Sequence, residues 1–205
     1  MRGLEELSAG QVLEQAVERH HPRLTMACSF QKEESVLIDM LMAIEPDARV
    51  FTIDTGVLFP ETYEVWRQVE DRYGLKLEIQ DASSPDGRPW TGGDRCCGQH
   101  KVDGLDRALD GVEAWITGIR REQSPTRAEA PKLERDEKRG VWKFNPLADW
   151  TEKDIWRYIH ERELPYHPLH DQGYASIGCT HCTLPSEGRD GRWAGSDKLE
   201  CGLHG

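Results

Sequence analysis

The 205-residue chain lacks the features that mark membrane, secreted and repeat proteins. No apolar run approaches the roughly 20 residues that span a bilayer, and residues 1–10 lack the basic and apolar regions of a signal peptide. There is neither an internal repeat nor a low-complexity segment. We therefore expect a soluble cytoplasmic protein, and the length fits one domain with an ample core.

Positive charge is also scarce, because 26 Lys and Arg face 37 Asp and Glu and leave a net charge of −11. This balance argues against a broad surface for DNA or RNA. It still allows a small anionic substrate, provided that cations are concentrated locally. The candidates in motif-like stretches are Lys101, Arg120, Arg121, Arg127, Arg189 and Arg192. Without those motifs, each would be read as a solvated surface charge.

Apolar periodicity and turn residues predict alternating strands and helices. The predicted strands cover 23–27, 49–53, 75–79, 113–117 and 141–145, and the predicted helices cover 4–19, 36–44, 60–73, 99–109 and 151–161. The charged segment 131–140 is expected to be an exposed linker or hairpin, and the pattern becomes irregular from Pro165 onward. Strands that alternate with helices are typical of an α/β fold with a doubly wound, mostly parallel sheet.

Ligands of such sheets bind at the carboxyl ends of the strands. Ser29, Ser35, Asp54 and Thr55 would lie near that edge. Residues 28–35 join a strand to a helix start, where backbone N–H groups and the helix dipole favour a phosphate. The segment lacks the glycines of a Walker loop. From the pattern alone, an ordinary capped connection is an equally good interpretation.

Six cysteines in a chain without a secretion signal favour metal ligation or catalysis over disulfides. Cys96-Cys97 and Cys179-x-x-Cys182 form two close pairs, which indicate a metal site. The side chains of adjacent cysteines such as Cys96 and Cys97 diverge, so they are poorly placed to bind one tetrahedral zinc ion. In a [4Fe–4S] cluster, each of the two could bind a different iron atom. We therefore favour the cluster over zinc or over unrelated buried thiols. Cys201 is then left over, either as a stray thiol in a frayed tail or as a nucleophile in a flexible arm.

Six motifs, in this order, resemble those of the assimilatory sulfonucleotide reductases, which reduce adenylyl sulfate or its 3′-phosphorylated form. They are Ser29-Phe30-Gln31-Lys32-Glu33, Asp54-Thr55-Gly56, Cys96-Cys97 with Lys101, Thr117-Gly118-Ile119-Arg120-Arg121 continuing to Ser124-Pro125-Thr126-Arg127, Cys179-x-x-Cys182, and Glu200-Cys201-Gly202-Leu203-His204. The resemblance runs from about residue 25 to the end of the chain. It implies an adenine nucleotide alpha hydrolase-like fold in a single domain, with residues 1–22 as an N-terminal helix and residues 183–205 as a mobile catalytic tail.

The resemblance also implies a reaction, the reduction of adenylyl sulfate to sulfite and AMP in assimilatory sulfate reduction. The Cys201 thiolate would attack the sulfur, expel AMP and carry an S-sulfonate. A thiol of thioredoxin or glutaredoxin would then release sulfite. The two cysteine pairs mark the cluster-containing branch of the family, which mostly uses adenylyl sulfate.

The same resemblance assigns residues to the substrate. The nucleotide would be held by Ser29 and Phe30, within the segment 29–35, and by the motif Asp54, Thr55 and Gly56. Lys101, Arg189 and Arg192 would bind the sulfate and phosphate, while Arg120, Arg121 and Arg127 would reach the phosphate or ribose. His204 would be the local partner of Cys201.

Three alternatives stay open. An ATP pyrophosphatase-type enzyme, for example in tRNA thiolation, would share the fold but should carry a glycine-rich loop in place of Ser29-Phe30-Gln31-Lys32. A zinc-stabilised binding module would be colourless and would have no turnover. Activity on the 3′-phosphorylated nucleotide, alone or together with adenylyl sulfate, is disfavoured by the cysteine pairs. Assembly as a homo-oligomer is left open.

Overall fold

A computed structural model describes residues 3–83, 99–193 and 203. The described helices are α1 (Ala9–His20), α2 (Lys32–Ile44), α3 (Pro60–Tyr73), α4 (Gln99–Ala108) and α5 (Glu152–Glu161), with short 3-10 helices η1 (Arg121–Gln123), η2 (Pro125–Arg127) and η3 (Pro168–Gln172). The described strands are β1 (Leu24–Ala27), β2 (Arg49–Asp54), β3 (Glu78–Asp81), β4 (Ala114–Ile116), β5 (Leu133–Asp136) and β6 (Val141–Phe144). None of the described helices is long and apolar enough to cross a bilayer.

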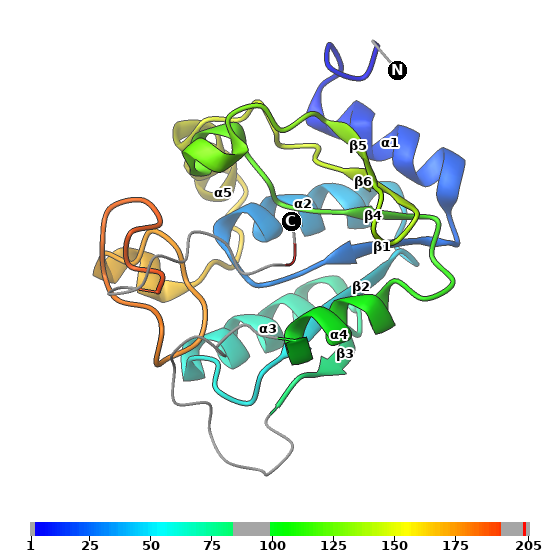
Figure 1. The fold of residues 1–205 in the computed structure, drawn as a ribbon. Helices are drawn as coiled ribbons and strands as arrows, with labels where there is room; N and C mark the ends of the chain where they lie inside the picture. The colour runs from blue at the N-terminus through cyan, green and yellow to red at the C-terminus, as the bar shows by residue number, and fades with distance from the viewer. Residues whose placement is uncertain (1–2, 84–98, 194–202, 204–205) are drawn as a thin grey trace.

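The strands form one sheet in the order β3-β2-β1-β4-β6-β5 (Figure 1). Neighbours from β3 to β6 pair in parallel, and only the pairing of the edge strand β5 with β6 is antiparallel. The predicted mostly parallel α/β sheet is therefore confirmed. The chain runs outward from β1 through β2 to β3, then returns to place β4 on the other side of β1. The strand order thus reverses between β1 and β4, which is where open α/β sheets bind ligands.

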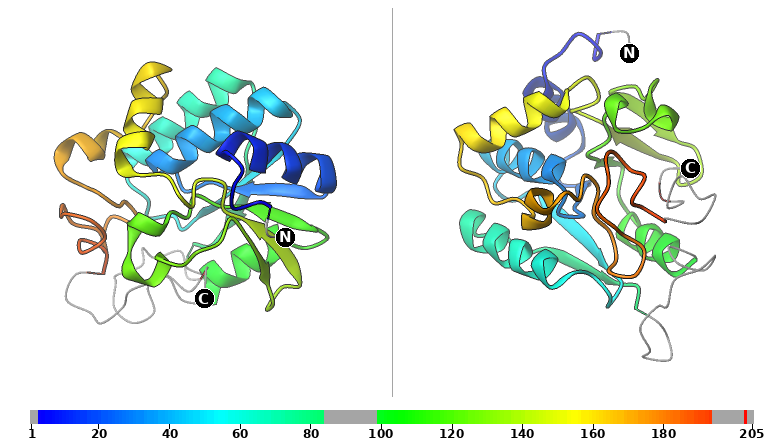
Figure 2. Two further views of the ribbon diagram at one scale, coloured as in Figure 1. Left: turned by 90° about the horizontal axis from the view of Figure 1, so that it is seen from above. Right: turned by 90° about the vertical axis from the view of Figure 1, so that its left-hand side faces the viewer.

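Helices cover both faces of the sheet. Figure 2 (left) shows α1, α2, α3 and α5 on one face and α4 on the other. Strands β1, β2 and β4 contribute apolar side chains to the cores on both faces of the sheet, because successive side chains along a strand point to opposite faces. Met26, Val50 and Ile116 lie in the large core under the four helices, while Phe51 and Trp115 lie in the smaller core under α4. Among the described α-helices, α4 alone covers its face, which leaves room there for a pocket.

Local signals explain several helix ends. The predicted helix 60–73 is confirmed at both ends, where Pro60 opens α3 and Gly74, with φ of 63°, stops it. Helix α5 begins after Thr151, whose hydroxyl accepts the N–H of Asp154 as the capping box predicts. Residues 131–140 adopt the hairpin alternative between β5 and β6.

Three predicted starts differ from the structure by three residues or more and were wrong. Helix α1 begins at Ala9 instead of residue 4, because Ser8 and Gln11 form a capping box there. Helix α2 begins at Lys32 instead of Val36, so the polar segment supplies the first helical turn. Strand β3 begins at Glu78 instead of residue 75, because the Leu77 N–H bonds to the side chain of Glu70 and is not available to a strand.

Candidate active site

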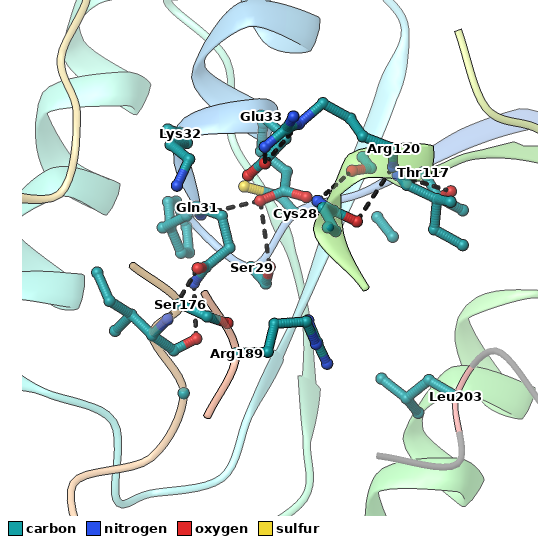
Figure 3. A pocket seen from close by; sticks show the side chains of 18 of the residues that line it. Cys28, Ser29, Gln31, Lys32, Glu33, Thr117, Arg120, Ser176, Arg189 and Leu203 are labelled. Carbon is teal, nitrogen blue, oxygen red and sulfur yellow. Dashed lines mark hydrogen bonds and ion pairs between the residues drawn. The ribbon is translucent and has the colours of Figure 1, made fainter. Parts of the chain in front are cut away.

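A pocket of about 460 Å³ opens at the carboxyl ends of β1, β2 and β4, where the strand order reverses (Figure 3). Its apolar floor includes Phe51, Leu105 and Trp115 from the α4 face. Its walls come from three segments that are distant in sequence, residues 28–34, 117–127 and 175–192. Leu203, close to the end of the chain, also lines the pocket and packs against the smaller core.

The first wall is the turn from β1 into α2. Phe30 has a left-handed backbone, with φ of 58°, and its buried ring stacks on Trp66 at 5.5 Å. A phenylalanine at positive φ is strained, and such strain persists where the surroundings enforce it. The turn anchors Phe30 in the core, while Ser29 donates to the Glu34 carboxyl at 3.2 Å. The α2 N-terminus therefore faces the pocket with its positive dipole end.

A buried charge cluster joins this wall to the second. Arg120 is only 2% exposed, and its guanidinium donates to Glu33 at 2.9 Å, Glu152 at 2.6 Å and Glu122 at 3.1 Å. Burial disfavours the charge of Arg120, yet Glu33 and the other carboxylates hold its pKa above the ordinary value. Burial likewise opposes ionisation of Glu33, but Lys32 and Arg120 outweigh it and lower the pKa. Glu33 and Arg120 are thus a charged pair.

Glu34, next in sequence, has the opposite character. Its carboxyl accepts the Gln31 N–H at 2.8 Å and the Ser29 hydroxyl, and within the described residues it makes no ion pair. Burial, followed by repulsion from Glu33, raises the pKa of Glu34 to about 8. Gly118 allows this packing, since a Cβ there would lie 2.5 Å from the Glu34 Oε1. A neutral carboxyl therefore lines the pocket at pH 7.

The third wall crosses over to α2. The Gln31 side chain bonds to the peptide of Ile177, and the Lys32 ammonium donates to the Ala175 carbonyl at 3.0 Å. Arg192 donates to the Ile177 carbonyl at 3.1 Å, and its guanidinium lies 4.7 Å from the centre of the Trp193 ring. The side chains of Lys101, Arg127, Arg189 and Arg192 place cationic groups around one cavity. Such a pocket suits a small anion.

Cys179 and Cys182 lie at the edge of this wall. Cys179 is 3% exposed, and its sulfur lies 3.3 Å from the Thr55 hydroxyl. The Cys182 N–H donates to the Cys179 carbonyl at 3.2 Å, so both residues belong to one turn. The hydrogen bond with Cys182, followed by burial, raises the pKa of Cys179, whereas the charge of Lys101 opposes the rise. Within the described residues, no three His, Cys, Asp or Glu side chains form a metal site.

Comparison with known proteins decides the family. Residues 23–185 match the phosphoadenosine phosphosulfate reductase domain. The chain belongs to this reductase family. It is 44% identical to the adenosine 5′-phosphosulfate reductase of Lysinibacillus sphaericus (strain C3-41), over 95% of this chain and 89% of that protein. It is 42% identical to the phosphoadenosine 5′-phosphosulfate reductase of Gloeobacter violaceus (strain ATCC 29082 / PCC 7421), over 99% of this chain and 91% of that protein.

A solved structure gives the same result for the reductase fold. The phosphate complex of phosphoadenylyl-sulfate reductase from Candida auris superposes with a TM-score of 0.78 at 32% identity. The match covers 89% of this chain and 93% of that one. The family and the α/β fold expected from the six motifs are therefore confirmed.

The predicted site residues of this reductase divide into three groups. Those that line the pocket are Ser29, Phe30, Lys101, Arg120, Arg127, Arg189 and Arg192. Those that are described but do not line it are Asp54, Thr55, Gly56, Arg121 and the predicted cluster ligands Cys179 and Cys182. Cys96, Cys97, Cys201 and His204 lie outside the described residues.

The second group has other contacts. Asp54 accepts the Gly56 N–H and the Tyr63 hydroxyl, both at 2.8 Å. Thr55 contacts Cys179, and Arg121 reaches outward to Glu5 at 2.6 Å. Within the first group, the Arg120 guanidinium is held by three carboxylates. Substrate roles for all these residues stay predictions.

Sequence reasoning missed Glu34 and Gln31 as individual site residues. Gln31 belongs to the motif Ser29-Phe30-Gln31-Lys32-Glu33 and Glu34 directly follows it, but neither was assigned a role. Adjacent acids, Glu33 and Glu34, at the start of a helix were the only available signal. That signal does not reveal which of the two is paired.

Proposed function

We propose that this chain reduces adenylyl sulfate to sulfite and AMP in assimilatory sulfate reduction. The observation that carries the proposal is that Lys101, Arg127, Arg189 and Arg192 gather around one pocket at the reversal of the strand order, in a chain whose net charge is −11. Lys101, Arg189 and Arg192 would bind the sulfate and phosphate, and Arg127 would reach the phosphate or ribose. The names of several relatives, including that of Lysinibacillus sphaericus, support adenylyl sulfate as the substrate.

The surroundings of the pocket suit both halves of such a substrate. The apolar floor with Leu105 and Trp115 offers a surface for adenine, and the α2 N-terminus offers N–H groups and a dipole to the phosphate. Cationic donors that already point into a water-poor site stabilise charge that develops on the leaving oxygen. Loss of one such donor typically costs about 3–4 kcal/mol of transition-state stabilisation.

Cys201 is the proposed nucleophile. Its thiolate forms a bond to the sulfur of the substrate, and the bond from sulfur to the bridging oxygen breaks, so that AMP leaves with the electron pair. A thiolate of thioredoxin or glutaredoxin next attacks the Cys201 sulfur, and sulfite leaves with the electron pair of the broken S–S bond. The second thiol of the reductant resolves the mixed disulfide and restores Cys201. Leu203, which lines the pocket, lies two residues further along the chain and supports this assignment.

We infer that the cofactor is a [4Fe–4S] cluster held by Cys96, Cys97, Cys179 and Cys182. The described half of this set fits the group, since Cys179 and Cys182 lie on one turn and thiolates are the ligands that iron–sulfur clusters take. When bound, the cluster would order the two cysteine segments and adjust the field at the sulfate. The reaction above needs no redox change of the cluster.

A second candidate is reduction of the 3′-phosphorylated nucleotide. The names of the Gloeobacter violaceus relative and of the Candida auris structure favour it. Activity on both nucleotides is the intermediate case.

One assay tests these proposals. Sulfite release is measured with thioredoxin from each nucleotide, on the wild type and on Cys201→Ser. We expect release by the wild type, chiefly from adenylyl sulfate, and none by Cys201→Ser, which should still bind AMP. Sulfite from Cys201→Ser would refute the nucleophile, and no sulfite from either nucleotide would refute the function.

The cofactor has its own test, which does not depend on activity. The protein purified without oxygen should be brown and contain four irons for each chain, as a [4Fe–4S] cluster requires. Cys179→Ser and Cys182→Ser should lose iron, whereas Cys201→Ser should keep it. A colourless wild type that contains zinc would refute the cluster.

A further inference from the structure

The side chain of Gln31 bridges two walls of the pocket. Its Nε2 donates to the Ile177 carbonyl at 2.7 Å, and its Oε1 accepts the Ile177 N–H at 2.9 Å, across 146 residues of sequence (Figure 3). The amide therefore pairs with both polar groups of one residue, as a neighbouring strand would. Two bonds set the direction of the Ile177 carbonyl, which a single bond would leave free to rotate.

The same carbonyl holds Arg192. The Arg192 Nη1 donates to the Ile177 carbonyl at 3.1 Å and to the Ser176 hydroxyl at 3.4 Å. Gly178 lets the guanidinium approach, since a Cβ there would lie 2.6 Å from the Arg192 Cζ. The Arg192 Nε is buried and has no hydrogen-bond partner among the described residues. Arg192 lines the pocket, so its guanidinium borders the space in which an anion would bind.

We propose that Gln31 is a positioning residue that fixes Arg192 through the Ile177 carbonyl, so that Arg192 presents its remaining donors to the anionic group of the substrate. A long arginine side chain loses much rotamer freedom when it binds an anion. Because Gln31 fixes the Ile177 carbonyl that accepts from Arg192, part of this rotamer freedom is already lost before the substrate binds. The inference rests on the proposed function for the identity of the anion.

Neighbouring contacts distinguish positioning of Arg192 by Gln31 from a role in which Gln31 only attaches the segment 175–178 to α2. Lys32 already ties the segment to α2 through the Ala175 carbonyl. Arg127, another cation of the pocket, comes from the segment 117–127 and donates to Gln123 at 2.6 Å. If Gln31 acted only by holding the walls together, its loss would affect Arg127 and Arg192 alike.

A double-mutant cycle tests the inference. The dissociation constant of adenylyl sulfate is measured in the Cys201→Ser background, where substrate is not consumed, for Gln31→Met, Arg192→Ala and their combination. Gln31→Met should weaken binding on the order of tenfold, which is the upper end of the effect of losing a hydrogen bond between neutral groups. In the Arg192→Ala background, Gln31→Met should have little further effect. The matched cycle with Arg127→Ala should be additive.

A second readout follows the contact itself. Hydrogen exchange at the Ile177 amide should accelerate in Gln31→Met, which offers no acceptor, and should stay slow in Gln31→Glu, which retains one. Additive effects of Gln31→Met and Arg192→Ala, equal coupling to Arg127, or unchanged exchange at Ile177 would each overturn the inference. The same cycle can be measured with inorganic sulfate in place of adenylyl sulfate. Its result decides the role of Gln31 even if the wild type releases no sulfite, an outcome that would refute only the proposed function.

Discussion

Replacing the buried acid Glu34 with glutamine should change how stability depends on pH. Burial, followed by Glu33, raises the pKa of Glu34 from 4.5 to about 8, so the folded chain keeps a proton that the unfolded chain has lost at neutral pH. Stability from this group is therefore complete below pH 4.5 and falls as pH rises toward 8. The slope approaches about 1.4 kcal/mol for each pH unit.

Glu34→Gln removes this dependence and keeps the contacts. The amide oxygen can still accept the Ser29 hydroxyl and the Gln31 N–H, which the carboxyl accepts at 3.2 and 2.8 Å. Between pH 4.5 and about 8, the stability of Glu34→Gln relative to the wild type should rise by an upper limit of roughly 5 kcal/mol. Above that interval the difference should stay constant, since the wild-type carboxyl is then ionised in both states.

Urea unfolding at each pH from 5 to 9, followed by tryptophan fluorescence, measures the difference. Contributions of the other titrating groups are common to both proteins and cancel. The exceptions are the groups that interact electrostatically with Glu34, which are Glu33 and the Cys28 thiol. A difference that is flat between pH 5 and 8 would show that Glu34 is ionised in the fold and would refute the reasoning. AMP affinity supplies a second check, because the wild type but not Glu34→Gln should bind more weakly above pH 8.

Three further predictions follow from the same region. Gly118→Ala should lower AMP affinity, because its Cβ would lie 2.5 Å from Glu34 and displace the carboxyl, and calorimetric titration measures this. Arg120→Met should destabilise the fold by about 3–5 kcal/mol in urea unfolding, since it removes the ion-pair partner of the buried Glu33. A loss of AMP affinity without loss of stability would instead favour a substrate role for Arg120. Thr151→Ala, which removes only the α5 cap, should cost about 1 kcal/mol without changing AMP affinity, and it serves as the control for both.

The fold was predictable because its signals are local. Pro60 and Gly74 bound α3, Thr151 caps α5, and the alternation of apolar strands with helices indicated a parallel sheet. Each of these depends on backbone preferences or on side chains within a few residues, which the sequence displays directly. The six motifs similarly indicated the family, since their order along the chain is itself sequence information.

The roles of adjacent charged residues were not predictable in this way. Arg120 and Arg121 belong to one motif, yet Arg120 turns inward to Glu33 and Arg121 turns outward to Glu5. Glu33 and Glu34 divide similarly into a paired carboxylate and a neutral acid. The order of motifs and strands was enough to indicate which chemical groups gather at the strand ends. Which of these groups pair and which remain for a ligand follows from the folded arrangement, because charge pairing and burial depend on partners about 30 to 150 residues away.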